Sequence, residues 1–197
     1  MAQDCDSKGS RDRAISALVQ HAKGIFEKNT CATRLVAPIS PSPQDLIHTV
    51  FDNIRLSPQD VVLDLGCGDG RWLLAAALLR GCAGRGLDLN EHLLIKGRRA
   101  AAEAGVASLI VLEMKDIFHA SLAGSTVIIL YLFREGLAKM KDKLEAEADH
   151  GSRIVSVGFQ IRGWISVATV VVGGLHAYIY HNPDRGASSE NGAGVTP

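Results

Sequence analysis

The stretch VVLDLGCGDGRW, residues 61–72, decides the fold of this chain. It begins with branched apolar residues, as a buried strand of a parallel sheet requires. Glycines then occupy every second position from Gly66 to Gly70, and such a turn lets the backbone approach a ligand without interference from a Cβ atom. Helix-forming Leu and Ala residues follow at 73–79, and Gly81 stands where a helix C-terminus favours glycine. The stretch therefore predicts a strand, a ligand-binding turn and a helix.

The carboxylate before the glycines separates two classes of ligand. Dinucleotide sites follow the spacing G-x-G-x-x-G and bind a pyrophosphate, but here Arg71 stands where the third glycine is required. Asp64 would repel a pyrophosphate, whereas it would accept a hydrogen bond from a cationic amino group. S-adenosylmethionine has an ammonium group and a sulfonium cation, so we expect it as the cofactor. The stretch resembles motif I of the class I S-adenosylmethionine-dependent methyltransferases.

Two further strands extend the pattern in the order that this enzyme class has. Residues 86–90 contain Asp88, which follows the glycines by about 20 residues, the spacing at which a carboxylate reaches a ribose diol. Residues 111–118 contain a strand and then Asp116, which the resemblance implies accepts a hydrogen bond from the adenine amino group. The apolar residue after it is expected to pack on the adenine ring. Together these features predict that the following residues bind the cofactor: Ser42, Asp64, Gly66, Cys67, Gly68, Gly70, Asp88, Leu89, Asp116 and Ile117.

A fourth strand is expected at residues 127–133, which carry no charge and contain Tyr131 near their end. Ligands of open α/β sheets bind at the carboxyl ends of the strands, near the point where the strand order reverses. We therefore expect Tyr131 to be the catalytic residue that lines the channel for the methyl acceptor.

Each candidate residue also has a structural interpretation. Asp64 could cap the next helix, Asp88 could cap the helix after Asn90, and Ser42 could cap the helix that begins at residue 43. Asp116 could be an ordinary turn acid. Tyr131 could be a core residue with a satisfied hydroxyl, Cys67 a small residue of the turn, and Trp164 a core residue.

The order of elements predicts an α/β protein with one Rossmann-like methyltransferase domain. We expect a mostly parallel seven-stranded sheet with one antiparallel edge strand and helices on both faces, since Gly173-Gly174 marks a hairpin between two β-rich stretches. Within the helix at 91–105, we expect Leu94, Ile95 and Ala102 to face the sheet. The domain is expected at residues 35–183, after a polar segment and amphipathic helix at 1–34 and before a disordered tail at 184–197.

Composition excludes several function classes. The chain has 197 residues, 47% of them hydrophobic, and a formal net charge of zero, so no overall field attracts nucleic acid. No apolar run is long enough for stable membrane insertion, and the four cysteines lack the spacing of a metal site. Asp4, Asp6 and Asp12 argue against a transit or secretory peptide, so we expect an intracellular and cytoplasmic protein rather than a mitochondrial one.

Residues 37–180 as a whole resemble the lysine methyltransferases of the ATP synthase c-subunit and their small prokaryotic relatives. The resemblance rests on a proline-rich segment before the first helix, DLGCGDGR, GLDLN, KDIF and LYL. It implies N-methylation of lysine in a protein substrate by direct in-line transfer. The sequence departs from the family pattern at three places: Ile39 replaces an aromatic residue, Arg134 replaces a proline, and Gly158 replaces a frequent acid. The alternatives are a small-molecule methyltransferase and a non-catalytic partner subunit that binds S-adenosylmethionine. The sequence does not specify the oligomeric state of the protein.

Overall fold

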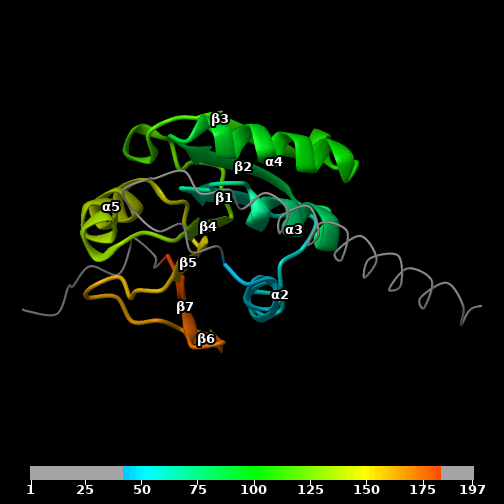
Figure 1. The fold of residues 1–197 in the computed structure, drawn as a ribbon. Coiled ribbons are helices and arrows are strands. Elements are labelled where there is room, and N and C mark those ends of the chain that lie inside the picture. Colours follow the sequence, from blue (N-terminus) through cyan, green and yellow to red (C-terminus); the bar gives the residue numbers. More distant parts are fainter. Residues whose placement is uncertain (1–41, 183–197) are drawn as a thin grey trace, which may run out of the picture.

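A computed structural model describes residues 42–182 of the chain. The expected amphipathic helix, the polar N-terminal segment and the C-terminal tail therefore lie outside the described residues. Seven strands form one sheet in the order β3-β2-β1-β4-β5-β7-β6 (Figure 1). The strands are β1 (Val61–Leu65), β2 (Ala83–Asp88), β3 (Ile110–Met114), β4 (Val127–Leu130), β5 (Arg153–Val157), β6 (Ala168–Val172) and β7 (Leu175–His181).

The sheet is mostly parallel, as expected. Strands β1 to β5 pair with their neighbours in parallel, and β7 pairs with β5 and with β6 in the antiparallel direction. The antiparallel strand β7 lies one position inside the edge, which β6 forms. Gly173 and Gly174 join β6 to β7 with φ angles of 58° and 81°, which glycine adopts without strain. The predicted hairpin is therefore confirmed.

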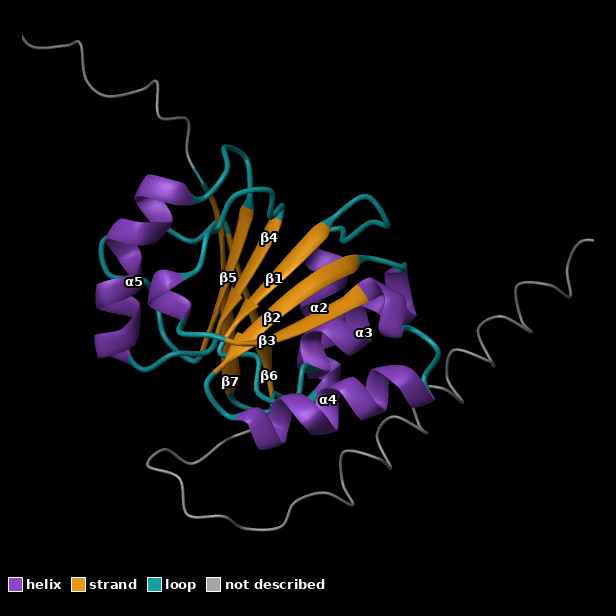
Figure 2. Ribbon diagram, turned by 90° about the horizontal axis from the view of Figure 1, so that it is seen from above, coloured by secondary structure: helices purple, strands orange, loops and turns teal. Residues whose placement is uncertain are grey.

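Helices cover both faces of the sheet, and Figure 2 shows α5 on one side and α2, α3 and α4 on the opposite side. The helices are α2 (Gln44–Asn53), α3 (Arg71–Arg80), α4 (Glu91–Glu103) and α5 (Arg134–Glu147), with short 3₁₀ turns η1 (Ala107–Leu109) and η2 (Ile117–His119). Successive strand residues point to opposite faces, so Val62 and Ile129 pack under α2 and α3 while Leu63 packs under α5. The doubly covered sheet explains why its central strands read as continuous apolar runs.

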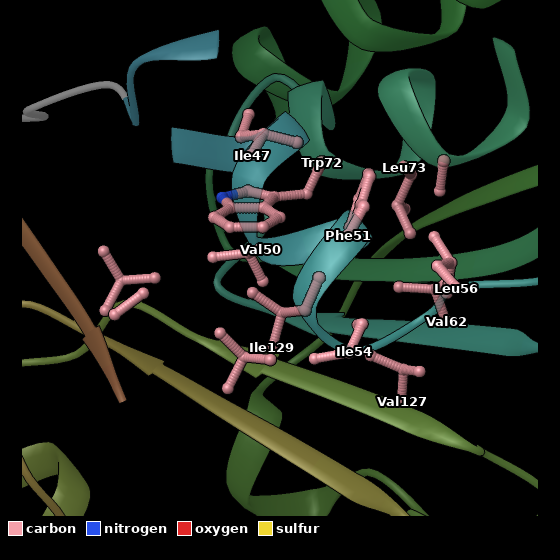
Figure 3. Close-up of a cluster of buried hydrophobic side chains, with 14 of the residues drawn as sticks. Ile47, Val50, Phe51, Ile54, Leu56, Val62, Trp72, Leu73, Val127 and Ile129 are labelled. Carbon is pink, nitrogen blue, oxygen red and sulfur yellow. The ribbon is translucent and has the colours of Figure 1, made fainter. Parts of the chain in front are cut away.

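An aromatic pair anchors α2 to α3 on the first face. Phe51 and Trp72 meet edge to face, with ring centroids 5.6 Å apart and planes at 71° (Figure 3). Both residues are buried, since Phe51 is 0% and Trp72 3% exposed. Burial of one such side chain contributes about 1.5–3 kcal/mol, so this pair fixes α2 beside the start of α3.

The expected cap of α2 is wrong. Pro43 is the residue before the helix, and no side chain caps its first turn. The hydroxyl of Ser42 instead accepts a hydrogen bond of 3.1 Å from the indole N–H of Trp72. A buried indole N–H needs an acceptor, and Ser42 supplies it from a position 30 residues earlier in the sequence.

The expected sheet-facing side of α4 is correct at Leu94 and wrong at Ile95 and Ala102. Leu94 is fully buried, but Ile95 is 53% exposed and Ala102 is also exposed. The buried side consists of Leu94, Gly97, Ala100 and Ala101. The small residues of α4 face the sheet because Gly97 packs directly on the glycine turn. The spacing of apolar residues in the sequence does not predict this contact.

Candidate cofactor and acceptor site

The glycine turn after β1 is held against the end of β2. The backbone N–H groups of Gly66 and Cys67 both donate to the carbonyl of Leu87, at 2.8 and 3.0 Å. Gly66, Gly68 and Gly70 have φ angles of 83°, 55° and 71°. These angles lie in the left-handed region, where a side chain would cost about 1–2 kcal/mol per residue. The three glycines therefore specify this turn, and at these three positions no side chain covers the backbone.

Gly97 of α4 is a contact of the turn that sequence reasoning missed. A Cβ atom at Gly97 would lie 2.5 Å from the backbone oxygen of Asp69 and 3.0 Å from its carbonyl carbon. The helix can approach the turn only because residue 97 has no side chain. A glycine inside a helical pattern costs about 1 kcal/mol relative to alanine and usually has a packing reason, so this signal was present in the sequence.

Asp88 joins the glycine turn to the start of α4. One carboxylate oxygen accepts a hydrogen bond of 2.8 Å from the N–H of Gly68, and the other accepts one of 2.8 Å from the N–H of Asn90. Asp88 does not cap α4, because Asn90 does so through the N–H of Leu93 at 3.3 Å. A carboxylate has about four acceptor sites, so Asp88 keeps the capacity to bind a ribose diol, which stays a prediction. Leu89 follows with 71% of its surface exposed.

Asp64 is buried beneath the same turn, and one of its oxygens lacks a partner. The residue is 3% exposed, and no residue within 42–182 forms a hydrogen bond with its Oδ2 atom. Burial raises its pKa to about 8, the charges of Asp88 and Asp69 add to this rise, and the charge of Arg71 opposes it. Asp64 does not cap α3, since that helix has no side-chain cap. A buried carboxylate needs a cation or a donor, so this atom fits the ammonium group of S-adenosylmethionine.

Arg71 stabilises the far side of the turn, a role that sequence reasoning missed. Its guanidinium group binds both carboxylate oxygens of Asp69, at 2.9 and 2.6 Å. It also donates to the carbonyl of Ser42 at 3.5 Å. Because its hydroxyl pairs with Trp72, Ser42 connects the chain before α2 to α3, and its contact with the cofactor stays a prediction.

Asp116 and Ile117 lie beyond β3, next to the end of β2. The N–H of Lys115 donates to the carbonyl of Asp88 at 3.1 Å, which holds this segment beside the end of β2. The carboxylate of Asp116 accepts a hydrogen bond of 2.9 Å from Phe118 N–H and lies 3.3 Å from His119 Nδ1. Asp116 thus stabilises the turn with its side chain, as its structural interpretation predicts. Ile117 packs on the core under α5. Their adenine contacts stay predictions.

Tyr131 follows the last residue of β4, at the carboxyl end of the sheet. Its ring packs against the core, and a Cβ atom at Gly158 would lie 3.1 Å from its Cε2 atom. No residue in the described part of the chain forms a hydrogen bond with its hydroxyl. The ring thus packs on the core, as the structural interpretation predicts. That interpretation also requires a hydrogen-bond partner for the hydroxyl, and residues 42–182 supply none.

Cys67 and Trp164 have surroundings that agree with their structural interpretations, and the cofactor contact of Cys67 stays a prediction. Burial raises the pKa of the Cys67 thiol far above its ordinary value, and the charges of Asp64 and Asp88 add to this, so the thiol is neutral and unreactive. Trp164 donates to Glu145 at 2.9 Å and meets Tyr180 edge to face at 5.5 Å.

Neither a metal site nor a membrane span is found within residues 42–182. This part of the chain contains no group of three or more His, Cys, Asp or Glu side chains that could hold a metal ion. Its helices are all too short or too polar to cross a bilayer.

Comparison with solved structures connects this geometry to methyl transfer. A structure described as an RNA methyltransferase from Salinibacter ruber, in complex with S-adenosyl-L-homocysteine, matches with a TM-score of 0.72 and 31% identity. The match covers 76% of this chain and 97% of that one. It confirms the expected fold and supports S-adenosylmethionine as the cofactor.

Comparison with curated proteins identifies similar enzymes. A protein-lysine N-methyltransferase from Saccharolobus islandicus is 30% identical over 64% of this chain and 80% of its own length. The mouse adenine nucleotide translocase lysine N-methyltransferase is 32% identical over 75% of this chain and 64% of its own length. The mouse lysine N-methyltransferase of the ATP synthase c-subunit, of the type that the sequence motifs resemble, is 25% identical over 66% of this chain and 52% of its own length.

The profile of one protein family matches residues 64–168, which include the glycine turn, Asp88 and Tyr131. The expected resemblance and the expected methyltransferase activity are therefore confirmed at the level of the family. The chain belongs to the family described as the ANTKMT methyltransferase domain, and it is an S-adenosylmethionine-dependent methyltransferase.

Proposed function

We propose that the protein transfers a methyl group directly from S-adenosylmethionine to the side-chain amine of a lysine in a protein substrate. The observation that carries the proposal is the unpartnered Oδ2 atom of Asp64, buried beside the glycine turn of the described residues. The names of the archaeal and mouse relatives support lysine as the acceptor. Asp64 and Asp88 would hold the cofactor, and the cofactor supplies a methyl group on a positively charged sulfur.

The protein contributes alignment and a neutral acceptor. An in-line displacement requires no enzyme nucleophile, so orientation of the two reactants accounts for much of the rate. A lysine ammonium cannot attack, and an apolar channel lowers the pKa of an amine that enters it. Tyr131 offers such a surface with its core-packed ring, and its hydroxyl can form a hydrogen bond that orients the neutral amine toward the methyl group.

The test is transfer of a labelled methyl group from S-adenosylmethionine into fractionated cell lysate. Label in a protein band that survives nuclease and yields methyl-lysine on hydrolysis supports the proposal. Label that nuclease removes would favour an RNA acceptor, which the name of the Salinibacter ruber protein suggests for that protein. Label only in small molecules, or none at all with cofactor binding intact, would favour the small-molecule enzyme or the non-catalytic subunit.

The role of Tyr131 is tested in the same assay. We expect Tyr131→Phe to lower turnover by about tenfold without weakening cofactor binding, because the loss of one hydrogen bond that orients the amine costs about 1.4 kcal/mol. Tyr178→Phe is a matched control, since Tyr178 stacks on His176 in β7. Equal turnover of the two variants would exclude Tyr131 from catalysis and leave the lysine assignment to the lysate assay.

A further inference from the structure

Three side chains near Tyr131 form a surface cluster in which Phe133 and Arg134 are exposed, while Phe159 is half-buried and also packs against the core. Phe133 and Phe159 meet with centroids 6.4 Å apart and planes tilted by 49°. The guanidinium carbon of Arg134 lies 5.1 Å from the centroid of the Phe159 ring. We call Phe133, Arg134 and Phe159 the aromatic–arginine patch. About 25 residues of sequence separate Arg134 from Phe159, so sequence reasoning did not bring them together.

The patch lies beside the expected path of the acceptor. Strands β4 and β5 are parallel neighbours paired through Leu130 and Ser156, so the segments that follow them leave the sheet at the same edge. Phe133 and Arg134 come soon after Tyr131 in the chain, and Phe159 comes directly after Gly158, which the Tyr131 ring contacts. A polypeptide that presents a residue to Tyr131 would therefore extend over the patch.

The patch is held in place from below. The hydroxyl of Ser156 donates to the carbonyl of Phe159 at 2.7 Å, which fixes the turn after β5. Phe133 is nevertheless 55% exposed, and Arg134 is exposed as well. One exposed ring, one half-buried ring and an exposed cation on a fixed backbone are typical of recognition surfaces, where aromatic residues and arginine are enriched.

Arg134 offers a defined site for a carboxylate. Within residues 42–182 the guanidinium group contacts the Phe159 ring and forms no ion pair, whereas two lysines of the same helix pair with glutamates: Lys141 with Glu145 at 3.3 Å and Lys143 with Glu147 at 2.6 Å. A guanidinium group stacked on a ring is already oriented and keeps its N–H edge accessible, and that edge matches a carboxylate with two parallel hydrogen bonds.

The Phe159 ring offers little open face to a nucleic-acid base. Base stacking needs an open aromatic face, but Arg134 covers one face of Phe159, and Phe133 meets the same ring at a tilt. The formal net charge of zero also provides no field for a phosphate backbone.

We propose that the aromatic–arginine patch selects protein acceptors that carry an aspartate or glutamate near the methylated lysine. The carboxylate binds the N–H edge of Arg134, and the rings of Phe133 and Phe159 cover the apolar part of the same segment. This inference rests on the proposed lysine methyltransferase function.

The test uses the full chain, labelled S-adenosylmethionine and an array of Ala- and Ser-based peptides with one central lysine. Each peptide carries Glu, Gln or Lys at one position within four residues of the lysine. We expect the wild-type protein to methylate a Glu peptide about tenfold better than its Gln counterpart at one or two positions, the effect of one charge-assisted pair at a partly exposed site.

The variants separate recognition from folding and from catalysis. Arg134→Gln is expected to reduce the preference to less than about twofold while it leaves cofactor affinity and methylation of the Gln peptides unchanged, and Arg134→Glu should shift the preference to Lys peptides. Lys139→Gln, an exposed charge change on the same helix, should keep the wild-type preference.

The outcomes distinguish this inference from the proposed function. If the protein labels lysine in lysate proteins but prefers no Glu peptide, or if Arg134→Gln keeps the preference, the patch does not recognise a carboxylate and the lysine function stands. Label confined to nucleic acid or small molecules overturns both proposals.

Discussion

Asp60 and Asp64 are buried aspartates at opposite ends of β1, and their surroundings are opposite. Asp60 accepts hydrogen bonds from Ser57 N–H at 2.8 Å and from the Thr126 hydroxyl at 2.7 Å, and it forms an ion pair with Arg153. Burial alone would raise its pKa, but these hydrogen bonds and the charge of Arg153 hold it below the ordinary value. The Oδ2 atom of Asp64 has no partner among the described residues, and the pKa of this group is raised to about 8.

The difference supports the carboxyl end of the sheet as the end that binds a ligand. A buried charge is stable only if it is paired. At the amino end the chain supplies the partners itself, whereas at the carboxyl end the described residues leave a carboxylate for a ligand to satisfy. Parallel sheets bind ligands at their carboxyl ends, so the polar chemistry of the two aspartates agrees with the topology.

The largest effect on folding is expected at the amino end. Asp60→Asn should lower the free energy of unfolding by about 3 kcal/mol at pH 7, because it leaves Arg153 without its counter-ion. The pKa of Asp60 is depressed, so its contribution is present at neutral pH and is lost as the pH falls through the folded pKa. Chemical denaturation of both proteins from neutral to acidic pH measures this, and the difference between them should shrink toward low pH. Cofactor affinity of the folded variant should equal that of the wild type, and a large loss would mean that the two ends are not independent.

A second large effect is expected from Asp88, the other carboxylate at the carboxyl end. Asp88→Ala should weaken S-adenosylhomocysteine binding by about 100-fold, because it removes the acceptor of Gly68 N–H and Asn90 N–H together with the expected ribose contact. Isothermal titration calorimetry measures the affinity. Glu91→Gln, in the exposed first turn of α4, is the control. Equal affinities of the two variants would show that Asp88 does not bind the cofactor.

The sequence predicted the cofactor half of this site well because its signals are local. The carboxylate, the glycines and the next strand follow one another within about 25 residues, and their order alone suggests how Asp64 and Asp88 converge. The missing partner of Asp64 was not predictable, because it depends on which side chains other strands bring over it. The same reason explains Ser42: its cap was a local expectation, and the pairing with Trp72 joins residues 30 positions apart.

Asp64→Asn is expected to change the free energy of unfolding in the opposite direction. Asp60→Asn lowers it, whereas Asp64→Asn should raise it, by a smaller amount. The folded protein keeps the Asp64 proton up to a pKa of about 8, while the unfolded chain loses it near the ordinary value of 3.8. Stability therefore falls as the pH rises between these two values. Asn carries no charge, so without ligand the variant should be about 2 kcal/mol more stable than the wild type at about pH 7.5. The gain is smaller than the pKa shift alone would give, because the buried amide also lacks a hydrogen-bond partner. Thermal unfolding at about pH 7.5 and pH 5 tests this: the gain should be smaller at the lower pH, and an unchanged or lower Tm at the higher pH would contradict the raised pKa.

The smallest effect concerns the pH dependence of cofactor binding. It distinguishes an ionised Asp64 that pairs with the ligand from an Asp64 that stays protonated when the ligand binds. If the cofactor ammonium pairs with ionised Asp64, binding must release the proton that this group holds below a pKa of about 8. Affinity for S-adenosylhomocysteine should then rise between about pH 6 and pH 7.5, by at most about tenfold per pH unit. Calorimetry in buffers of different ionisation enthalpy should detect the released proton. Asp64→Asn should bind more weakly and show neither the pH dependence nor the proton release. A wild-type affinity independent of pH would mean that the ligand leaves Asp64 protonated, so the ammonium group would pair elsewhere in the site.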